Sequence, residues 1–275
     1  MTSALILPAQ FILEKCGLPL TDEQPLQLCV GEFAAFLGLL GASMIMAFVE
    51  HKPLISFGLD GKRPFIRLSY GAVSGVIALS GMICVLKLSG FLLFDGQPIV
   101  DWNAMKFAFA WGAGFFLVGL YEEYLFRGYL QKTLTRGIGF WWSALVLSIA
   151  FGISHIFNKG ESTVGVAAVT LLGLVLCISL WYLKDLWWAI GFHSSWDWAQ
   201  SYFWGTANSG KVLQSHLFSV HPQGNILFSG GSTGPEGSVM VIPLLLFIAF
   251  LMWIVWRRKT PQQSEKVDTT TTSQS

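Results

Sequence analysis

Charged residues are scarce in this sequence. Asp, Glu, Lys and Arg together make up 12% of its 275 residues, about half of the roughly 25% that is usual in soluble domains. A soluble globular fold is therefore a poor interpretation. The net charge of +1 gives no reason to expect an acidic partner. The chain also lacks a basic patch interleaved with aromatic residues, so we expect no nucleic acid as a partner.

Cysteine is rare and shows no pattern. The four cysteines are Cys16, Cys29, Cys84 and Cys177, and none of them forms the CxxC spacing of a redox or metal-binding pair. The last two lie in apolar runs, where cysteine acts as a small hydrophobe. Met1–Phe11 lacks the positive leader and the small-residue cleavage site of a signal peptide. We therefore expect the membrane spans themselves to direct insertion.

Apolar residues are abundant. They form 53% of the chain, including 12 Trp and 22 Phe, and the mean hydropathy is +0.57. Several runs reach the roughly 20 apolar residues that cross a bilayer. The pattern predicts an all-α, polytopic membrane helix bundle with about seven transmembrane spans. The expected spans are 26–49, 69–88, 105–130, 140–157, 164–183, 186–204 and 239–256.

The spans divide the chain into three parts. Residues 1–25 are expected to form an interfacial segment, residues 26–256 a transmembrane domain whose polar motifs lie within 105–204, and residues 257–275 a disordered cytoplasmic tail. Within the domain, residues 205–238 are rich in Gly and Ser and predict a flexible connection.

The loop charges orient the bundle, because cytoplasmic loops are enriched in Lys and Arg. They predict an integral, multi-pass membrane protein with its N-terminus outside and its C-terminus in the cytoplasm. One side of the bundle has Lys52, Lys62, Arg63, Arg67, Lys132, Arg136, Lys184 and the basic cluster from Arg257, and the other has little beyond Lys15, Lys159 and Lys211.

The third span contains three charges in the sequence Tyr-Glu-Glu-Tyr-Leu-Phe-Arg-Gly-Tyr, residues 121–129. A charge at the centre of a membrane helix costs about 2.5 to 3.5 kcal/mol, so such groups need partners or a water-filled cavity. Glu123 and Arg127 have the favourable i, i+4 spacing of an ion pair, which alone is explained by a structural role. One Arg cannot neutralise two acids, however. Glu122 points about 100° away, toward the neighbouring helices.

Two later spans contain polar pairs at helical spacing. Phe151 and His155 share one face of the fourth span, and His193 and Asp197 share one face of the sixth. Each pair alone is explained by hydrogen-bonded packing. Alternatively, Asp197 sets the tautomer and basicity of His193, or the two bind a water or a metal. Three such sets on three polar-poor helices favour one shared functional site.

The three polar sets resemble the three motifs of the CPBP family in type and in order along the chain. They are Glu-Glu-x-x-x-Arg, Phe-x-x-x-His and His-x-x-x-Asp. This family of intramembrane proteases includes the Rce1-like CAAX prenyl endopeptidases and the bacteriocin-processing and immunity (Abi) proteins. Gly128 and Trp196 look like the bacterial branch. The resemblance implies an endopeptidase in a bacterial inner membrane. Its substrate would be a membrane-associated protein or peptide, either prenylated (CAAX-type) or leader-bearing.

The resemblance also implies residue roles. Glu122 and His155 would activate a water, His193 with Asp197 would stabilise the oxyanion, and Glu123 would complete the catalytic set. In the eukaryotic members of the family, the third motif resembles His-x-x-x-Asn, whereas this chain has Asp197 in place of the Asn. An ionised carboxylate cannot donate a hydrogen bond. Asp197 would then be protonated, or orient His193, or help to bind a metal.

The sequence specifies no cofactor with certainty. Glu122, His155, His193 and Asp197 offer nitrogen and oxygen ligands for a divalent metal such as Zn or Mn, but no HExxH helix is present, and the resemblance equally supports a metal-free, glutamate-based mechanism. Two other functions stay open, an intramembrane proton-relay or transport protein and a catalytically silent scaffold or immunity protein. The chain lacks the inverted repeat of many transporters, which favours the protease.

The depths of the motifs set a condition on this site. At 1.5 Å per residue, Glu122 lies roughly 12 to 20 Å from the basic turn that follows the third span, and His155 lies roughly 22 Å along the fourth. The two meet only if the third span stays helical past Arg127 toward Arg136, or if the fourth is tilted or begins outside the hydrocarbon.

Overall fold

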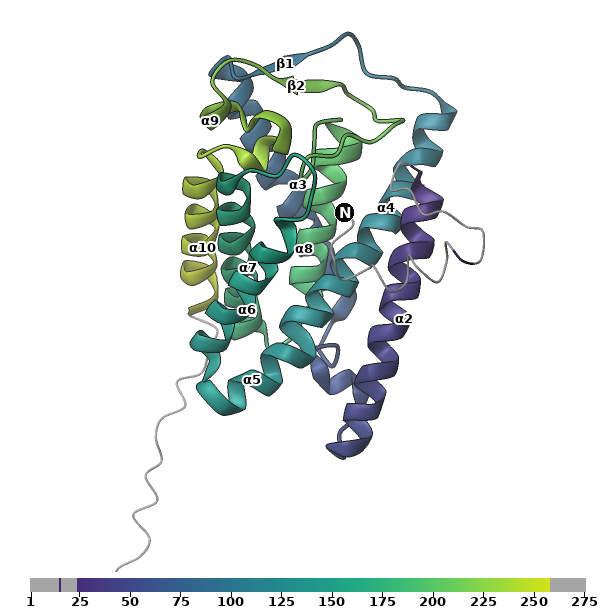
Figure 1. Ribbon diagram of the computed structural model, residues 1–275, viewed down its shortest axis with the longest axis vertical. Coiled ribbons are helices and arrows are strands. Elements are labelled where there is room, and N and C mark those ends of the chain that lie inside the picture. Colours follow the sequence, from purple (N-terminus) through teal and green to yellow (C-terminus); the bar gives the residue numbers. More distant parts are fainter. Residues whose placement is uncertain (1–14, 16–23, 258–275) are drawn as a thin grey trace, which may run out of the picture.

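The computed structural model of the protein describes residue 15 and residues 24–257. The predicted interfacial segment 1–25 and the predicted disordered tail 257–275 lie almost wholly outside these residues. The described chain is a bundle of long helices that run up and down along one direction (Figure 1). In chain order, they are α2 (Pro25–Val49), α3 (Pro64–Leu88), α4 (Trp102–Glu123), α5 (Gln131–Ile138), α6 (Phe140–His155), α7 (Thr163–Leu183), α8 (Trp187–Trp198) and α10 (Val241–Arg257).

Short elements connect or extend these helices. The π-helical segment η2 (Tyr124–Leu130) joins α4 to α5, and η3 (Ala199–Phe203) extends α8. The strands β1 (Leu92–Phe94) and β2 (Val220–Pro222) form an antiparallel pair in which Leu93 faces His221. The other short elements are η1 (Leu54–Phe57), α9 (Ile226–Ser229), η4 (Gly231–Thr233) and η5 (Pro235–Gly237).

The helix starts follow from local sequence. Pro25 and Pro64 occupy the first turns of α2 and α3, where proline's missing N–H is tolerated. Asp101 caps α4 by accepting a hydrogen bond from the Ala104 N–H at 2.6 Å, and Ser162 caps α7 from the Gly165 N–H at 3.0 Å. These caps satisfy donors that have no partner inside the helix.

Among the described residues, four helical rods are long and apolar enough to cross a membrane, and they are α2, α3, the continuous rod Trp102–Ile138, and α7. The helices α6 and α10 are apolar but shorter. Together with α8 and η3, they confirm the predicted all-α membrane bundle, and the chain is an integral membrane protein. The rod from Trp102 to Ile138 stays helical past Arg127, so the condition on the depths of the motifs is met.

Helix α8 lies at the centre of the bundle, and every residue from Trp188 to Asp197 is buried. It packs most extensively against α3 and α4. The α3 contact depends on glycine, because a Cβ on Gly191 would lie 2.1 Å from the Leu68 carbonyl oxygen, and a Cβ on Gly71 would lie 2.1 Å from the Trp188 carbonyl oxygen. Close helix approach through small residues is typical of membrane bundles.

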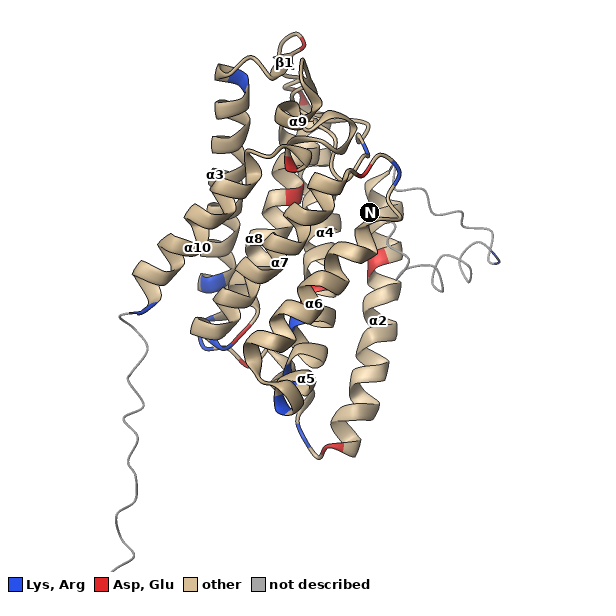
Figure 2. Cartoon of the chain, turned by 60° about the vertical axis from the view of Figure 1, so that its left-hand side comes forward, with Lys and Arg blue, Asp and Glu red and all other residues tan. Residues whose placement is uncertain are grey.

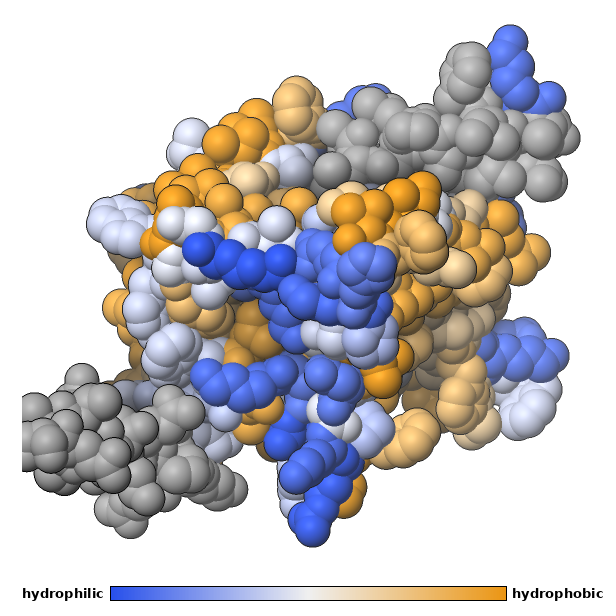
Figure 3. Space-filling view, turned by 90° about the horizontal axis from the view of Figure 1, so that it is seen from below, coloured by the Kyte–Doolittle hydropathy of each residue, from blue (hydrophilic) through white to orange (hydrophobic). Residues whose placement is uncertain are grey.

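The two ends of the bundle differ in charge. The C-terminal ends of α2 and α10, the start of α3 and the helix α5 meet at one end, opposite the β1–β2 pair (Figures 1 and 2). Seen from this end, hydrophilic residues occupy the centre and hydrophobic residues form much of the surrounding surface (Figure 3). Large apolar side chains such as Phe48 and Phe65 are exposed on the helices, as expected for surfaces that face lipid.

The connection 205–238 is not flexible, contrary to the prediction. It folds onto the end of the bundle that bears β1 and β2 (Figure 1), and Thr233 and Ser238 are fully buried in it. Its glycines permit tight turns, since Gly210 and Gly230 have φ values of +82° and +84°, which other residues rarely adopt. Glycine content therefore reflects tight turns here, and the segment packs against the helices.

Candidate active site

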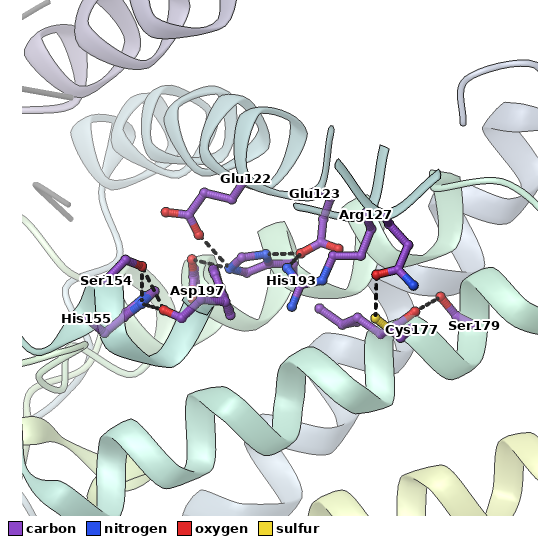
Figure 4. Close-up of polar contacts among 12 residues, drawn as sticks. Glu122, Glu123, Arg127, Ser154, His155, Cys177, Ser179, His193 and Asp197 are labelled. Atoms are coloured by element: carbon purple, nitrogen blue, oxygen red, sulfur yellow. Dashed lines mark hydrogen bonds and ion pairs between the residues drawn. The ribbon is translucent and has the colours of Figure 1, made fainter. Parts of the chain in front are cut away.

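The three motifs come together inside the bundle. Glu122 and Glu123 end α4, His155 ends α6, and His193 and Asp197 lie on the central helix α8. Figure 4 shows the side chains of His155, Asp197, His193 and Glu123 in one row, with Glu122 above Asp197 and His193. All five are buried, with at most 5% of each residue exposed. The structure therefore gathers every candidate site residue into one enclosed polar site.

Glu123 and Arg127 form a fully buried ion pair. Arg127 Nη1 donates to Glu123 Oε1 at 3.0 Å, and neither residue has measurable exposure. The Arg127 guanidinium carbon also lies 4.4 Å from the centre of the Phe151 ring, within the range of a cation–π contact. Arg127 therefore joins the first motif on α4 and η2 to the second motif on α6.

His193 lies among three carboxylates. Its Nδ1 is 2.9 Å from Glu123 Oε1, while its Nε2 is 3.7 Å from Glu122 Oε2 and 3.6 Å from Asp197 Oδ2. Glu123, paired with Arg127, acts as an acceptor, so Nδ1 of His193 carries a hydrogen. A bare lone pair on Nε2 would repel two facing carboxylates. A proton therefore belongs either on Nε2 or on one of the carboxyl groups that face it.

His155 is oriented by its own helix. Its Nδ1 lies 2.8 Å from the Phe151 carbonyl oxygen and 3.3 Å from the Ser154 hydroxyl. A carbonyl oxygen can only accept, so Nδ1 donates and the Nε2 atom of a neutral His155 is its basic nitrogen. The Phe151 ring contacts both imidazoles, with its centre 4.8 Å from the His155 ring and 5.9 Å from the His193 ring.

Two π-helical segments start beside the motif carboxylates. η2 begins directly after Glu123, and η3 begins two residues after Asp197. π-helical turns are rare and often occur at functional sites, because the widened turn changes the direction of side chains. The sequence did not indicate them, since both segments lie within spans that were expected to be regular helices.

The connection 205–238 contributes polar groups that the sequence did not indicate. Asn208 is buried, and its amide nitrogen donates to Asp197 Oδ1 at 3.2 Å. Glu236 is also buried, and it accepts hydrogen bonds from the backbone N–H and the hydroxyl of Ser209. Burial raises the pKa of Glu236 to about 8, with smaller contributions from the nearby carboxylates of Glu161 and Asp197. Asn208 lies eleven residues beyond Asp197 in an irregular segment, where helical spacing predicts nothing.

The candidate metal ligands are not grouped around one metal position in the part of the chain that the structure describes. Within residues 24–257 and at residue 15, no group of three or more His, Cys, Asp or Glu side chains is arranged to hold a metal ion. Glu123 and the Phe151 carbonyl accept hydrogen bonds from the Nδ1 atoms of the two imidazoles, which leaves only the Nε2 atoms available to a metal. The ligand set Glu122, His155, His193 and Asp197 that the sequence offered for a divalent metal such as Zn stays a prediction.

Comparison with known proteins supports the resemblance. No curated protein and no solved structure matches the chain. A family model does match residues 104–199, which contain all three motifs, and its description is type II CAAX prenyl endopeptidase Rce1-like. This match confirms the resemblance to the CPBP family over residues 104–199 of this chain.

Proposed function

We propose that this protein is an intramembrane endopeptidase that hydrolyses a peptide bond with a water activated by Glu122. One observation supports this most directly. Glu122 Oε2 and Asp197 Oδ2 both face His193 Nε2, at 3.7 and 3.6 Å, inside a buried site. Amide hydrolysis requires a general base close to a hydrogen-bond donor. In this site Glu122 would be the base and His193 the donor.

In this proposal Glu122 removes a proton from the water while the water oxygen attacks the scissile carbonyl carbon. The Nε2 atom of His155 accepts a hydrogen bond from the same water and orients it. The proton taken by Glu122 then passes to the leaving amine nitrogen as the C–N bond breaks. The products are a carboxylic acid and an amine, the acid proton then passes to the amine to give a carboxylate and an ammonium group, and Glu122 is ionised again for the next cycle.

His193 stabilises the oxyanion through its Nε2–H, on the side of the ring that faces Glu122 and Asp197. Glu123 accepts from Nδ1 and fixes the ring, and Arg127 holds Glu123 in place. Asp197 stays ionised and balances the charge of the imidazolium from 3.6 Å. Asp197 thus acts through His193, and it needs no proton of its own to serve in place of an asparagine.

The substrate in this proposal is a membrane-associated protein, either prenylated at a CAAX-type C-terminus or carrying a leader. The basic end of the bundle, where α10 ends, would face the cytoplasm. The protein would then lie in a bacterial inner membrane with its C-terminus in the cytoplasm. The Rce1-like domain supports this substrate class because CAAX-type substrates are anchored to membranes.

Cleavage of a farnesylated CAAX peptide by the purified protein in lipid nanodiscs tests the proposal. Glu122→Gln should keep the fold and its thermal stability but lower kcat by at least about 10³-fold, since it loses the base. Glu50→Gln is the matched control, because it makes the same change at a carboxylate outside the spans, and it should cleave like the wild type. Cleavage by Glu122→Gln at the wild-type rate would overturn the proposal.

A peptide probe covers only one substrate class. Mass spectrometry of membrane-protein termini, in cells that express the wild type or Glu122→Gln, extends the test to leader-bearing substrates. New termini should appear with the wild type alone. Identical termini in the two strains, with no cleavage of the peptide, would instead support a catalytically silent protein.

A further inference from the structure

Asp197 is held from outside its own helix. Its Oδ1 atom accepts a hydrogen bond from Asn208 Nδ2 at 3.2 Å, and its Oδ2 atom faces His193 Nε2 at 3.6 Å. The same amide nitrogen lies 3.2 Å from the Ser201 hydroxyl. The two hydrogens of the Asn208 amide are thus directed to one residue of α8 and one of η3. The two carboxylate oxygens of Asp197 are divided between an amide and an imidazole.

The backbone around Asn208 is fixed by the connection 205–238. Asn208 and Lys211 form a bridge across a two-residue turn, in which Ser209 and Gly210 have φ values of +47° and +82°, as in the tight turns of hairpins. The residue before Asn208 is held as well, because Gln200 Nε2 donates to the Ala207 carbonyl oxygen at 2.7 Å.

The far side of the turn is also anchored. The buried carboxyl group of Glu236 accepts from the Ser209 N–H, and the Gly210 N–H donates to the Thr233 carbonyl oxygen at 3.2 Å. Thr233 in turn donates from its hydroxyl to the Gly160 carbonyl oxygen, in the loop between α6 and α7. The position of the Asn208 amide is therefore set by contacts with three separate segments.

We infer that Asn208 is a positioning residue that holds the Asp197 carboxylate against His193, and that the connection 205–238 exists in its ordered form partly to present this amide. The inference rests on the proposed hydrolase function. A buried carboxylate that lacks donors is strongly destabilised, and rotation about its last side-chain bond would take Oδ2 away from the imidazole. The amide of Asn208 satisfies Oδ1 and prevents this rotation.

The side chain at position 208 must donate a hydrogen bond to Asp197. An asparagine amide nitrogen donates two hydrogen bonds and carries no charge, so it ties down Asp197 without competing with His193 for the negative charge. A lysine there would form its own ion pair with the carboxylate. An aspartate would place two carboxylates face to face, which is strongly unfavourable in a buried site.

Variants of Asn208 and Asp197, including an exchange of the two side chains, test the inference. Asn208→Asp should lower kcat for the farnesylated CAAX peptide at least about 100-fold and leave KM within about threefold, because Asp197 loses its donor while the binding surface is unchanged. The double variant Asp197→Asn with Asn208→Asp restores the hydrogen bond with donor and acceptor reversed. Since the exchange also removes the carboxylate that faces His193, its rescue is measured as stability and not as kcat.

The matched control is Asn225→Asp, in the same connection. The Asn225 side chain caps α9 by accepting from the Leu227 N–H at 2.9 Å, which an aspartate also does. This variant makes the same chemical change and should keep wild-type kcat. Asn208→Ala serves if Asn208→Asp does not fold, and it should also lower kcat with little change in KM.

Thermal unfolding of the same variants gives a readout that needs no substrate. Asn208→Asp should lower Tm by at least about 5 °C, and the exchanged pair should regain at least half of that loss. Wild-type kcat in Asn208→Asp, or an exchanged pair with a Tm as low as that of Asn208→Asp, would overturn the inference. If no variant cleaves but the Tm values couple, the contact stands and the proposed function fails.

Discussion

The Phe151 ring lies over the Arg127 guanidinium group, with 4.4 Å between the ring centre and the guanidinium carbon. The same ring contacts both imidazoles, so one aromatic side chain joins the buried ion pair to His155 and His193. The phenylalanine of the second motif is therefore part of the site itself. It packs between the Arg127 guanidinium group and the two imidazoles.

Phe151→Leu tests this role. Leucine keeps an apolar side chain but loses the flat face against Arg127 and both ring contacts, so we expect kcat to fall about tenfold or more and stability to fall by about 1 to 3 kcal/mol. Phe126→Leu is the control, since Phe126 is also buried and lies 5.8 Å from the guanidinium carbon. It should lose similar stability but keep most of its activity. Equal loss of activity in both variants would reduce Phe151 to a packing residue.

The Glu123–Arg127 pair predicts a non-additive effect on stability. Arg127→Gln leaves the Glu123 carboxylate buried without its cation, and such a change typically costs about 3 to 5 kcal/mol. The double variant Glu123→Gln with Arg127→Gln removes both charges and should be more stable than Arg127→Gln alone. Thermal unfolding in detergent measures both. Additive losses would show that the two side chains do not depend on each other.

Much of this site could be predicted from the sequence because its residues lie on helices. A period of 3.6 residues places Glu123 beside Arg127 and His193 beside Asp197, and the scarcity of charge elsewhere makes these residues stand out. The helical bundle follows from the same apolar runs, and the structure confirms it. The spacing of residues along each helix therefore predicts which side chains share a face, but it does not predict the distances between helices.

The rest depends on contacts that local spacing does not contain. Arg67 was expected in a loop, but α3 begins at Pro64, and Arg67 pairs from within the helix with Asp185 in the turn before α8. Asn208 reaches Asp197 only because the connection folds back over the bundle. Gly and Ser content predicted flexibility there, since composition does not distinguish glycines that permit tight turns from glycines that loosen a chain.

The proposed mechanism requires no metal, which predicts the effect of chelation. Dialysis against EDTA should leave cleavage of the farnesylated CAAX peptide within about twofold of the untreated protein, because Glu122 and His193 supply the base and the oxyanion donor themselves. Addition of Zn²⁺ after dialysis should give no increase. Loss of activity on dialysis that Zn²⁺ restores would show that the site residues rearrange to bind a metal, and would contradict the proposed roles.

The buried Glu236 predicts that stability depends on pH. Burial, and then the carboxylates of Glu161 and Asp197, raise the pKa of Glu236 in the folded protein to about 8, whereas an exposed Glu has a pKa of about 4.3. Between these values the folded state keeps a proton that the unfolded state has lost, so stability falls as pH rises, by up to about 1.4 kcal/mol per pH unit. Below pH 4.3 this contribution is fully present, and above pH 8 it is lost.

Glu236→Gln isolates this contribution, because glutamine stays neutral and its side-chain oxygen still accepts from the Ser209 N–H. We expect the Tm of the wild type to decrease from pH 5 to pH 8.5 and the Tm of the variant to decrease less over the same range. At pH 8.5 the variant should be the more stable protein. Since Ser209 adjoins Asn208, the wild type should also lose activity at high pH sooner than the variant. Parallel Tm curves for the two proteins would show that Glu236 is ionised in the folded state throughout this range.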